Sequence, residues 1–202
     1  MVAILLVLIG YNITDWIGSP VPSVHPTVSN RRSSDSFGQF DHTVQKVLMA
    51  RIAAGLLMFR VKNDVVQVLL AHPGGPYFQN QDDGVWTIPK GEPDPGEDLL
   101  VTARREFGRE TGFASEGPFI HLQPIRQKGG KIVHAWACEG DCDPKSIRSN
   151  LFTMEWPPKS SRQVRFPEID RAEFFDLKVA RVKIKPGQEA LIDELQGILK
   201  ST

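Results

Sequence analysis

The stretch Gly91–Phe113 reads GEPDPGEDLLVTARREFGRETGF, and it decides the fold that we expect. Asp94, Pro95 and Glu97 indicate a helix start: an aspartate N-cap, a proline at the first helical position, and a glutamate placed to complete a capping box. Gly112 is placed to end the same helix, because glycine readily adopts the left-handed conformation of a C-cap. We therefore expect one central helix between these two signals.

The apolar residues of this helix share one stripe of the helical wheel: Leu99, Leu100, Ala103 and Phe107. Glu106 and Glu110 lie along the edge of that stripe rather than opposite it. Two carboxylates four residues apart and shielded by a sheet repel each other, and a hard divalent cation bound through oxygen neutralises them. The pair indicates magnesium or manganese. The alternative is a solvated helix surface on which both glutamates pair with Arg105 and Arg109.

The larger pattern resembles the Nudix box, G-x5-E-x7-R-E-U-x-E-E-x-G-U, in which U is a bulky aliphatic or aromatic residue. The matching residues are Gly91, Glu97, Arg105, Glu106, Phe107, Glu110, Gly112 and Phe113. One defining position departs, because Arg109 stands where the box has the first glutamate of its E-E pair. Eight of nine defining positions over 23 residues make a specific match.

The rest of the chain agrees with that resemblance, which covers roughly residues 51–199 and implies a Nudix α/β/α sandwich. Strand patterns around the box, closed by a helical pattern at residues 187–199, also predict an α/β fold with a mixed β-sheet between helices. The expected strands are residues 52–59, 65–70, 85–88, 119–126, 132–138 and 172–175. The chain resembles most closely a bacterial-type subgroup of short Nudix proteins.

The resemblance also implies roles for individual residues of the box. Glu106 and Glu110 would hold Mg²⁺ or Mn²⁺, helped by the backbone carbonyl of Lys90. The residues that would shape the motif are Gly91, Glu97, Arg105 and Gly112. Arg109 would weaken metal binding, unless its guanidinium turns outward or contacts substrate phosphate directly.

Outside the box the candidates are fewer. Glu168 is the candidate general base, because a loop acid near the end of the sheet would reach water, although a solvated loop charge has the same pattern. Trp136 and His134 are candidates for lining the substrate pocket, and as strand residues they would equally serve as packing. His134, Cys138 and Cys142 lack the fourth ligand of a structural zinc site, so we expect no zinc.

Composition and the N-terminal segment limit the class of protein. The 24 basic and 24 acidic residues cancel, so neither broad nucleic-acid binding nor membrane binding is expected. The apolar run Met1–Ile9 is too short for a transmembrane helix, and the two cysteines favour a reducing, cytoplasmic compartment. We expect residues 1–48 to be an apolar start followed by a disordered Ser/Pro-rich extension, and residues 49–202 to be the Nudix hydrolase domain, with Met49 a candidate start.

The predicted function is that of a metal-dependent pyrophosphohydrolase. It would cleave a phosphoanhydride bond in a nucleoside diphosphate linked to another moiety, so a nucleotide-like diphosphate is the expected partner. The alternative is a Nudix-fold binding or regulatory protein whose activity is reduced or absent because Arg109 replaces a metal-ligand glutamate. The sequence leaves open the particular nucleotide, because loops around the sheet set selectivity, and it leaves open the oligomeric state.

Overall fold

The structure is a computed structural model that describes residues 51–201, and the predicted extension of residues 1–48 lies outside them. The strands are β1 Ile52–Lys62, β2 Val65–Pro73, β3 Lys90–Gly91, β4 Phe119–Arg126, β5 Ile132–Glu139, β6 Leu151–Glu155, β7 Gln163–Pro167 and β8 Ile169–Asp176. The helices are α3 Leu99–Thr111, α4 Leu177–Lys183 and α5 Glu189–Ser201, with short 3-10 turns η2 Pro144–Ser146 and η3 Pro186–Gln188.

The main sheet is mixed, as the sequence predicted. Its strands run in the order β4-β5-β1-β2-β8, and β3 pairs with the first half of β1. β1 lies parallel to β5 and antiparallel to β2 and β3. Asn63 and Asp64 turn the β1–β2 hairpin with positive φ angles of 52° and 60°, which suit the right-handed twist of the two strands.

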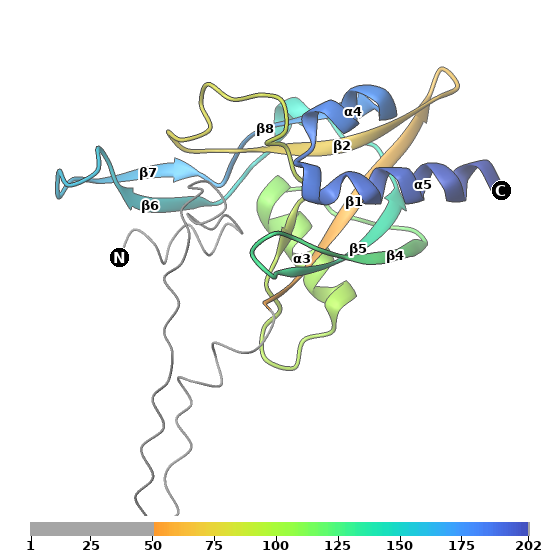
Figure 1. Ribbon diagram of the computed structural model, residues 1–202, viewed down its shortest axis with the longest axis horizontal. Coiled ribbons are helices and arrows are strands. Elements are labelled where there is room, and N and C mark those ends of the chain that lie inside the picture. The colour runs from red at the N-terminus through yellow and green to blue at the C-terminus, as the bar shows by residue number, and fades with distance from the viewer. Residues whose placement is uncertain (1–50, 202) are drawn as a thin grey trace, which may run out of the picture.

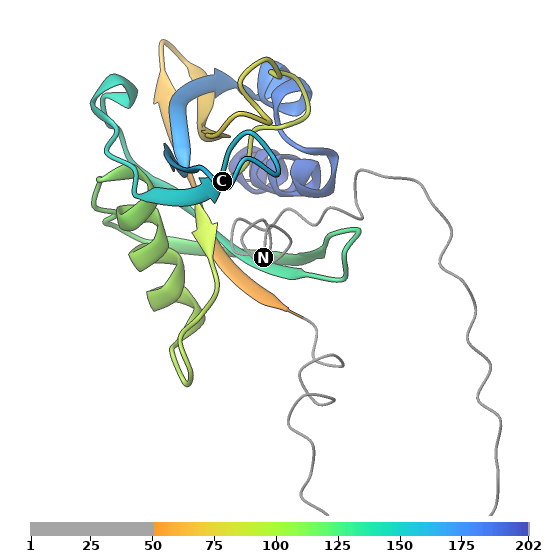
Figure 2. The same ribbon diagram turned by 90° about the vertical axis from the view of Figure 1, so that its left-hand side faces the viewer.

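Helices cover both faces of this sheet, which confirms the predicted α/β/α layering. In Figures 1 and 2, α3 lies against one face, while α4 and α5 lie against the other. Alternate residues of β1 serve the two layers: Leu56 packs in the core beneath α3, and Leu57 packs in the core beneath α4 and α5. Ala103 and Phe107 of α3 are fully buried, as the apolar stripe predicted.

The start of α3 differs from the prediction. Asp98, not Asp94, is the N-cap, and its side chain accepts hydrogen bonds from the backbone N–H groups of Leu100 and Val101. Gly96 adopts a φ of +79°, a left-handed conformation that a helix beginning at Pro95 could not contain. The bond predicted from Glu97 to the Asp94 N–H does form, at 2.9 Å, but it closes a turn before the helix. The end at Gly112 is confirmed, with φ +80°.

Other elements went unpredicted or are shorter than predicted. The β6–β7 ribbon and α4 were not expected, because their residues are interleaved with prolines and charges that read as loop. The strand expected at residues 85–88 reduces to two isolated bridges, Trp86 with Ile184 and Ala71 with Thr87. The ribbon projects from the body beside the loop that follows β2, as Figure 1 shows.

A chain that begins at Met49 is expected to melt at the same temperature as the full chain, within a few degrees. The two core clusters are built from residues 53–199, and Arg51 still provides the carbonyl that accepts from the Ile132 N–H at 2.8 Å. Thermal unfolding of both chains by circular dichroism checks this. A large loss of stability on truncation would show that the first residues pack against the domain.

Among residues 51–201, no helix is long and apolar enough to cross a bilayer.

Candidate active site

The two residues of β3, Lys90 and Gly91, contact the carboxylates of the box glutamates. Gly91 follows β3 directly, and a Cβ at that position would lie 2.2 Å from the Glu106 carboxyl carbon, so only glycine lets the chain pass so close. The backbone N–H of Lys90 donates to Glu110 Oε2 at 3.0 Å. The contacts of Gly91 and Lys90 therefore fix both carboxylates at one point between α3 and the sheet.

Both glutamates are buried, so they are not solvated surface acids, although Glu106 does pair with Arg105 and Arg109 as the alternative expected. Glu106 is 4% exposed and Glu110 is 9% exposed. Carboxylates at this depth are costly to ionise unless cations or hydrogen-bond donors compensate them. The groups around Glu106 and Glu110 must therefore supply positive charge, and the structure shows which groups do so.

Arg109 lies at the centre of the carboxylate cluster. Its Nε donates to Glu106 Oε2 at 2.7 Å, and its Nη1 lies 2.7 Å from Glu168 Oε2. Its Nη2 lies 3.7 Å from Glu110 Oε1. Burial works to lower the pKa of Arg109, but the bonds to Glu168 and Glu106 raise it above its ordinary value. One guanidinium thus compensates three carboxylates from two separate parts of the chain.

Arg105 and Glu97 hold the loop that precedes α3. Arg105 donates to both oxygens of Glu97 at 2.7 Å, and it also donates to Glu106. The bond from Arg105, helped by the Asp94 N–H and the Thr102 hydroxyl, lowers the pKa of Glu97 to about 2. This agrees with the structural role that was predicted for both residues.

Glu168 joins the cluster from the short link between β7 and β8. Its backbone N–H donates to the Asn150 carbonyl at 2.8 Å, and its carbonyl accepts from Gly74 N–H at 2.9 Å. The sequence proposed Glu168 only as a loop acid near the end of the sheet. The structure places it within ion-pair distance of Arg109, so it adjoins Glu106 and Glu110.

Two buried lysines accompany the acids. Lys90 is 7% exposed and Lys131 is 4% exposed. Burial lowers the pKa of the Lys90 ammonium, while the Glu110 carboxylate acts to raise it. Lys131 Nζ lies 3.1 Å from Glu92 Oε1. Sequence reasoning passed over Lys131, because Lys128–Lys131 reads as a solvent-exposed hairpin turn, and only the turn's position beside β3 reveals it.

Stability without divalent metal is expected to fall as the pH rises from about 5 to 8. Burial raises the pKa of Glu110 in the folded protein from its ordinary value of 4.5 to about 7, although the cationic Lys90 acts to lower it. The folded state therefore binds the Glu110 proton more tightly than the unfolded state does. This binding stabilises the protein at low pH, and the free energy of unfolding should fall by on the order of 2 kcal/mol as the pH rises through 7. Urea unfolding at pH 5 and pH 8 measures the change. In Glu110→Gln the free energy of unfolding should differ little between pH 5 and pH 8. An equal pH dependence in both proteins would contradict the assignment to Glu110.

Trp136 and His134 lie on the same side of the sheet as α3, and their ring contacts are with His121 rather than with the glutamates. The ring of Trp136 lies 5.1 Å from that of His121, and His121 stacks on His134 at 6.5 Å. Trp136 also packs against the core beneath α3. The packing reading therefore accounts for Trp136, and its role in substrate binding stays a prediction.

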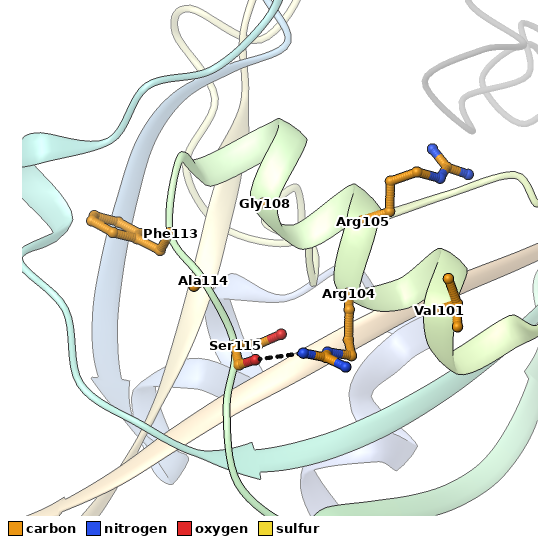
Figure 3. Close-up of a pocket in the computed structure, with 7 residues that line it drawn as sticks. All are labelled: Val101, Arg104, Arg105, Gly108, Phe113, Ala114 and Ser115. Atoms are coloured by element: carbon orange, nitrogen blue, oxygen red, sulfur yellow. Dashed lines mark hydrogen bonds between the residues drawn. The ribbon is translucent and has the colours of Figure 1, made fainter.

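A pocket of about 340 Å³ lies on the outer side of α3, and Figure 3 shows its lining. Arg104 reaches across it toward the carbonyl of Ser115, at 3.4 Å. Arg105 also lines it with its side chain while its guanidinium turns to Glu97. The pocket is therefore separate from the cluster of Glu106 and Arg109, which lies on another side of the helix.

The donors present suit a hard divalent cation, provided that Arg109 withdraws. Glu106 and Glu110 offer buried carboxylate oxygens, the ligand type that Mg²⁺ and Mn²⁺ prefer. The Arg109 guanidinium lies between them, and among residues 51–201 no three His, Cys, Asp or Glu side chains are arranged to hold a metal ion. A metal ion held by these two carboxylates would therefore take the place that the Arg109 guanidinium occupies.

Comparison with known proteins identifies the family of the chain. The model of the NUDIX domain matches residues 49–195. Bis(5'-nucleosyl)-tetraphosphatase [asymmetrical] of Rattus norvegicus is 36% identical over 105 residues, which are 45% of this chain and 66% of that protein. The Mus musculus protein of the same name is 34% identical over 105 residues, again 45% of this chain and 66% of that protein. The chain thus spans just under two thirds of these relatives.

Solved structures share the fold. An Ap4A hydrolase of C. elegans in a binary complex has a TM-score of 0.54 and 20% identity, covering 74% of this chain and 99% of that one. The NUDIX domain of a Shewanella oneidensis protein in complex with ADP ribose has a TM-score of 0.53 and 16% identity, covering 76% and 92%. With a family model that matches most of its length, this chain belongs to the NUDIX domain family.

Proposed function

We propose that the chain is a metal-dependent hydrolase that cleaves a phosphoanhydride bond in a nucleoside diphosphate linked to another moiety. The observation that carries this proposal is the buried pair Glu106 and Glu110, held by Gly91 and by the Lys90 N–H next to two buried lysines. Buried acids beside buried ammonium groups suit a ligand that combines a divalent cation with phosphate oxygens. Residues 49–202 would form the hydrolase domain.

The residues would divide the chemistry between them. Glu106, Glu110 and the Lys90 carbonyl would hold Mg²⁺ or Mn²⁺, which when bound supplies charge that stabilises the transferring phosphoryl group. The ammonium groups of Lys90 and Lys131 would compensate phosphate oxygens. Glu168 would accept a proton from the attacking water, once its carboxylate is released from Arg109.

The relatives support a substrate with a nucleotide on at least one side of the scissile bond. The names of the rat and mouse proteins specify a bis(5'-nucleosyl) tetraphosphate. For this chain the corresponding substrate class is a nucleoside polyphosphate whose distal group is a second nucleoside. Cys138 and Cys142 are both free thiols, which suits action in the cytoplasm.

One observation favours a second candidate function, that of a binding or regulatory protein with reduced turnover. Arg109 closes the cluster by pairing with Glu106 and Glu168, and a third carboxylate, Glu110, lies 3.7 Å from it. A cation built into the chain would compete with a metal ion, and its fork of donors is suited to phosphate. In this candidate the protein would hold the nucleotide without cleaving it.

A panel of nucleoside diphosphates and dinucleoside polyphosphates tests both candidates. The chain is incubated with each compound with and without Mg²⁺, and mass spectrometry of the products identifies the bond attacked. Hydrolysis that requires Mg²⁺ and disappears in Glu110→Gln supports the first candidate. Binding by calorimetry without any product supports the second. If the chain neither binds nor hydrolyses any compound of the panel, both candidate functions are overturned.

A further inference from the structure

A buried histidine joins three segments close to the candidate active site. His72, at the end of β2, is fully buried. Its Nδ1 lies 2.7 Å from Asp170 Oδ1 on β8, and its Nε2 lies 2.8 Å from the carbonyl oxygen of Gln81 in the loop that follows β2. The ring also meets Trp86 edge-on, with the centroids 5.1 Å apart. None of these contacts belongs to the Nudix box.

Both hydrogen-bond partners of the ring are acceptors. The Gln81 carbonyl accepts only, so Nε2 must carry a hydrogen atom. The contact between Nδ1 and Asp170 Oδ1 is the second bond of the ring. Together the two bonds tie the end of β2 both to the start of β8 and to the loop that follows β2.

A β-bulge gives Asp170 its place opposite His72. The β2–β8 ladder pairs His72 with Arg171 and then Pro73 with Ile169, so Asp170 is the extra residue. A bulge turns a side chain that regular pairing would send to the other face. Arg171 also reaches the ring of Trp86, at 5.3 Å, so Asp170 and its neighbour both approach the same side of the sheet.

The same bulge lies two residues from Glu168. The Glu168 backbone is bonded to Gly74 N–H at 2.9 Å, and the Glu168 carboxylate pairs with Arg109 at 2.7 Å. A Cβ at Gly74 would lie 2.1 Å from the Pro167 carbonyl oxygen, so the loop and the β7–β8 link are in close contact. The placement of Glu168 therefore depends on how the loop after His72 and the start of β8 are held together.

We propose that His72 and Asp170 are positioning residues, which set the place of Glu168 against Arg109 by tying the residue 74–81 loop to the start of β8. This rests on the proposed function only in giving Glu168 a catalytic role. The far end of the loop has separate anchors, since Trp86 Nε1 donates to Asp82 at 2.9 Å and Gly84 N–H donates to Val182 at 2.9 Å. Loss of the couple should therefore loosen the near part of the loop alone.

The experiment compares Asp170→Ala with Asp170→Asn. In Asp170→Asn a neutral His72 accepts from the side-chain amide and still donates to Gln81, so the geometry is kept. In Asp170→Ala the Nδ1 atom has no partner, and amide hydrogen exchange at Gly74 and Gln81 should rise about tenfold or more. Exchange at Gly84 serves as the internal control, and Glu173→Ala, an exposed acid on the same strand, as the matched variant.

The NMR signals of Arg109 test the proposal without turnover. The Arg109 Nη1–H resonances should move in Asp170→Ala and stay in Asp170→Asn, because Nη1 pairs with Glu168. Unaltered exchange and unaltered Arg109 signals in Asp170→Ala would overturn the proposal. If Asp170→Ala fails to fold, Asp170→Asn still decides, because raised exchange at Gly74 or moved Arg109 signals in that variant would overturn the proposal. Failure to hydrolyse nucleotides would leave these readouts unaffected.

Discussion

Glu106→Gln is expected to lower metal-dependent turnover by about a hundredfold or more, because a neutral amide removes one of the two buried carboxylates that would hold the proposed cation. The fold should survive, since each arginine bonded to Glu106 has a second carboxylate partner. Arg105 keeps Glu97 at 2.7 Å, and Arg109 keeps Glu168 at 2.7 Å. Steady-state release of phosphate or nucleotide product, together with thermal melts, separates loss of activity from loss of fold.

The control is Glu116→Gln, which changes an exposed acid just beyond the same helix. It should leave both turnover and melting temperature unchanged. Glu110→Gln should lose turnover as Glu106→Gln does, and its fold should also survive, because the amide oxygen of glutamine can still accept from the Lys90 N–H. Normal metal-dependent rates in both variants would show that the box acids are structural and that the cation binds elsewhere.

Arg109→Glu is expected to raise magnesium affinity and turnover, by about tenfold or more in affinity, because it replaces a competing cation with a third acid. Without metal the same change should lower stability by about 2 kcal/mol or more, since the carboxylates of Glu106, Glu110 and Glu168 lose their shared partner and gain a like charge. Calorimetric titration with MgCl2 and thermal melts with and without metal measure the two effects.

Arg109→Gln separates the two causes. It removes the guanidinium without adding a carboxylate, so it should raise metal affinity less than Arg109→Glu and destabilise the metal-free protein less. Unchanged affinity, turnover and stability in both variants would mean that Arg109 takes no part in the site. A rise in turnover for Arg109→Glu, from a low starting rate, would favour the binding or regulatory candidate for the unchanged chain.

The fold and the box were predictable because their signals are local. The apolar stripe of Ala103 and Phe107 and the left-handed stop at Gly112 depend on residues within a few positions of each other, and each lies where it was predicted. The N-cap predicted for α3, Asp94, lies four residues before the observed N-cap, Asp98. Asp94 and Asp98 are both good caps, and the conformation of Gly96, which the letters do not specify, chose between them.

The site was only half predictable for a different reason. Spacing on one helix placed Glu106 and Glu110 together, and the motif named Gly91 and Arg105 beside them. Lys131 and the His72–Asp170 couple had no such signal. Lys131 lies 39 positions from its partner Glu92, and His72 lies 98 positions from Asp170. Contacts over such separations depend on strand register, and the bulge at Asp170 shifts that register by one residue.

The sequence by itself determined the class of fold, the family, the helix that carries the acids, and the replacement of one acid by Arg109. The tertiary structure alone decided what that arginine does. On the helix Arg109 had Glu106 and Glu110 as neighbours, and a surface pair or an outward-turned side chain were equally open. Packing of the β7–β8 link brought Glu168 to within 2.7 Å of it, beside the buried Glu106 and Glu110. A cation enclosed by three carboxylates stays inward because turning out would leave those charges uncompensated away from water.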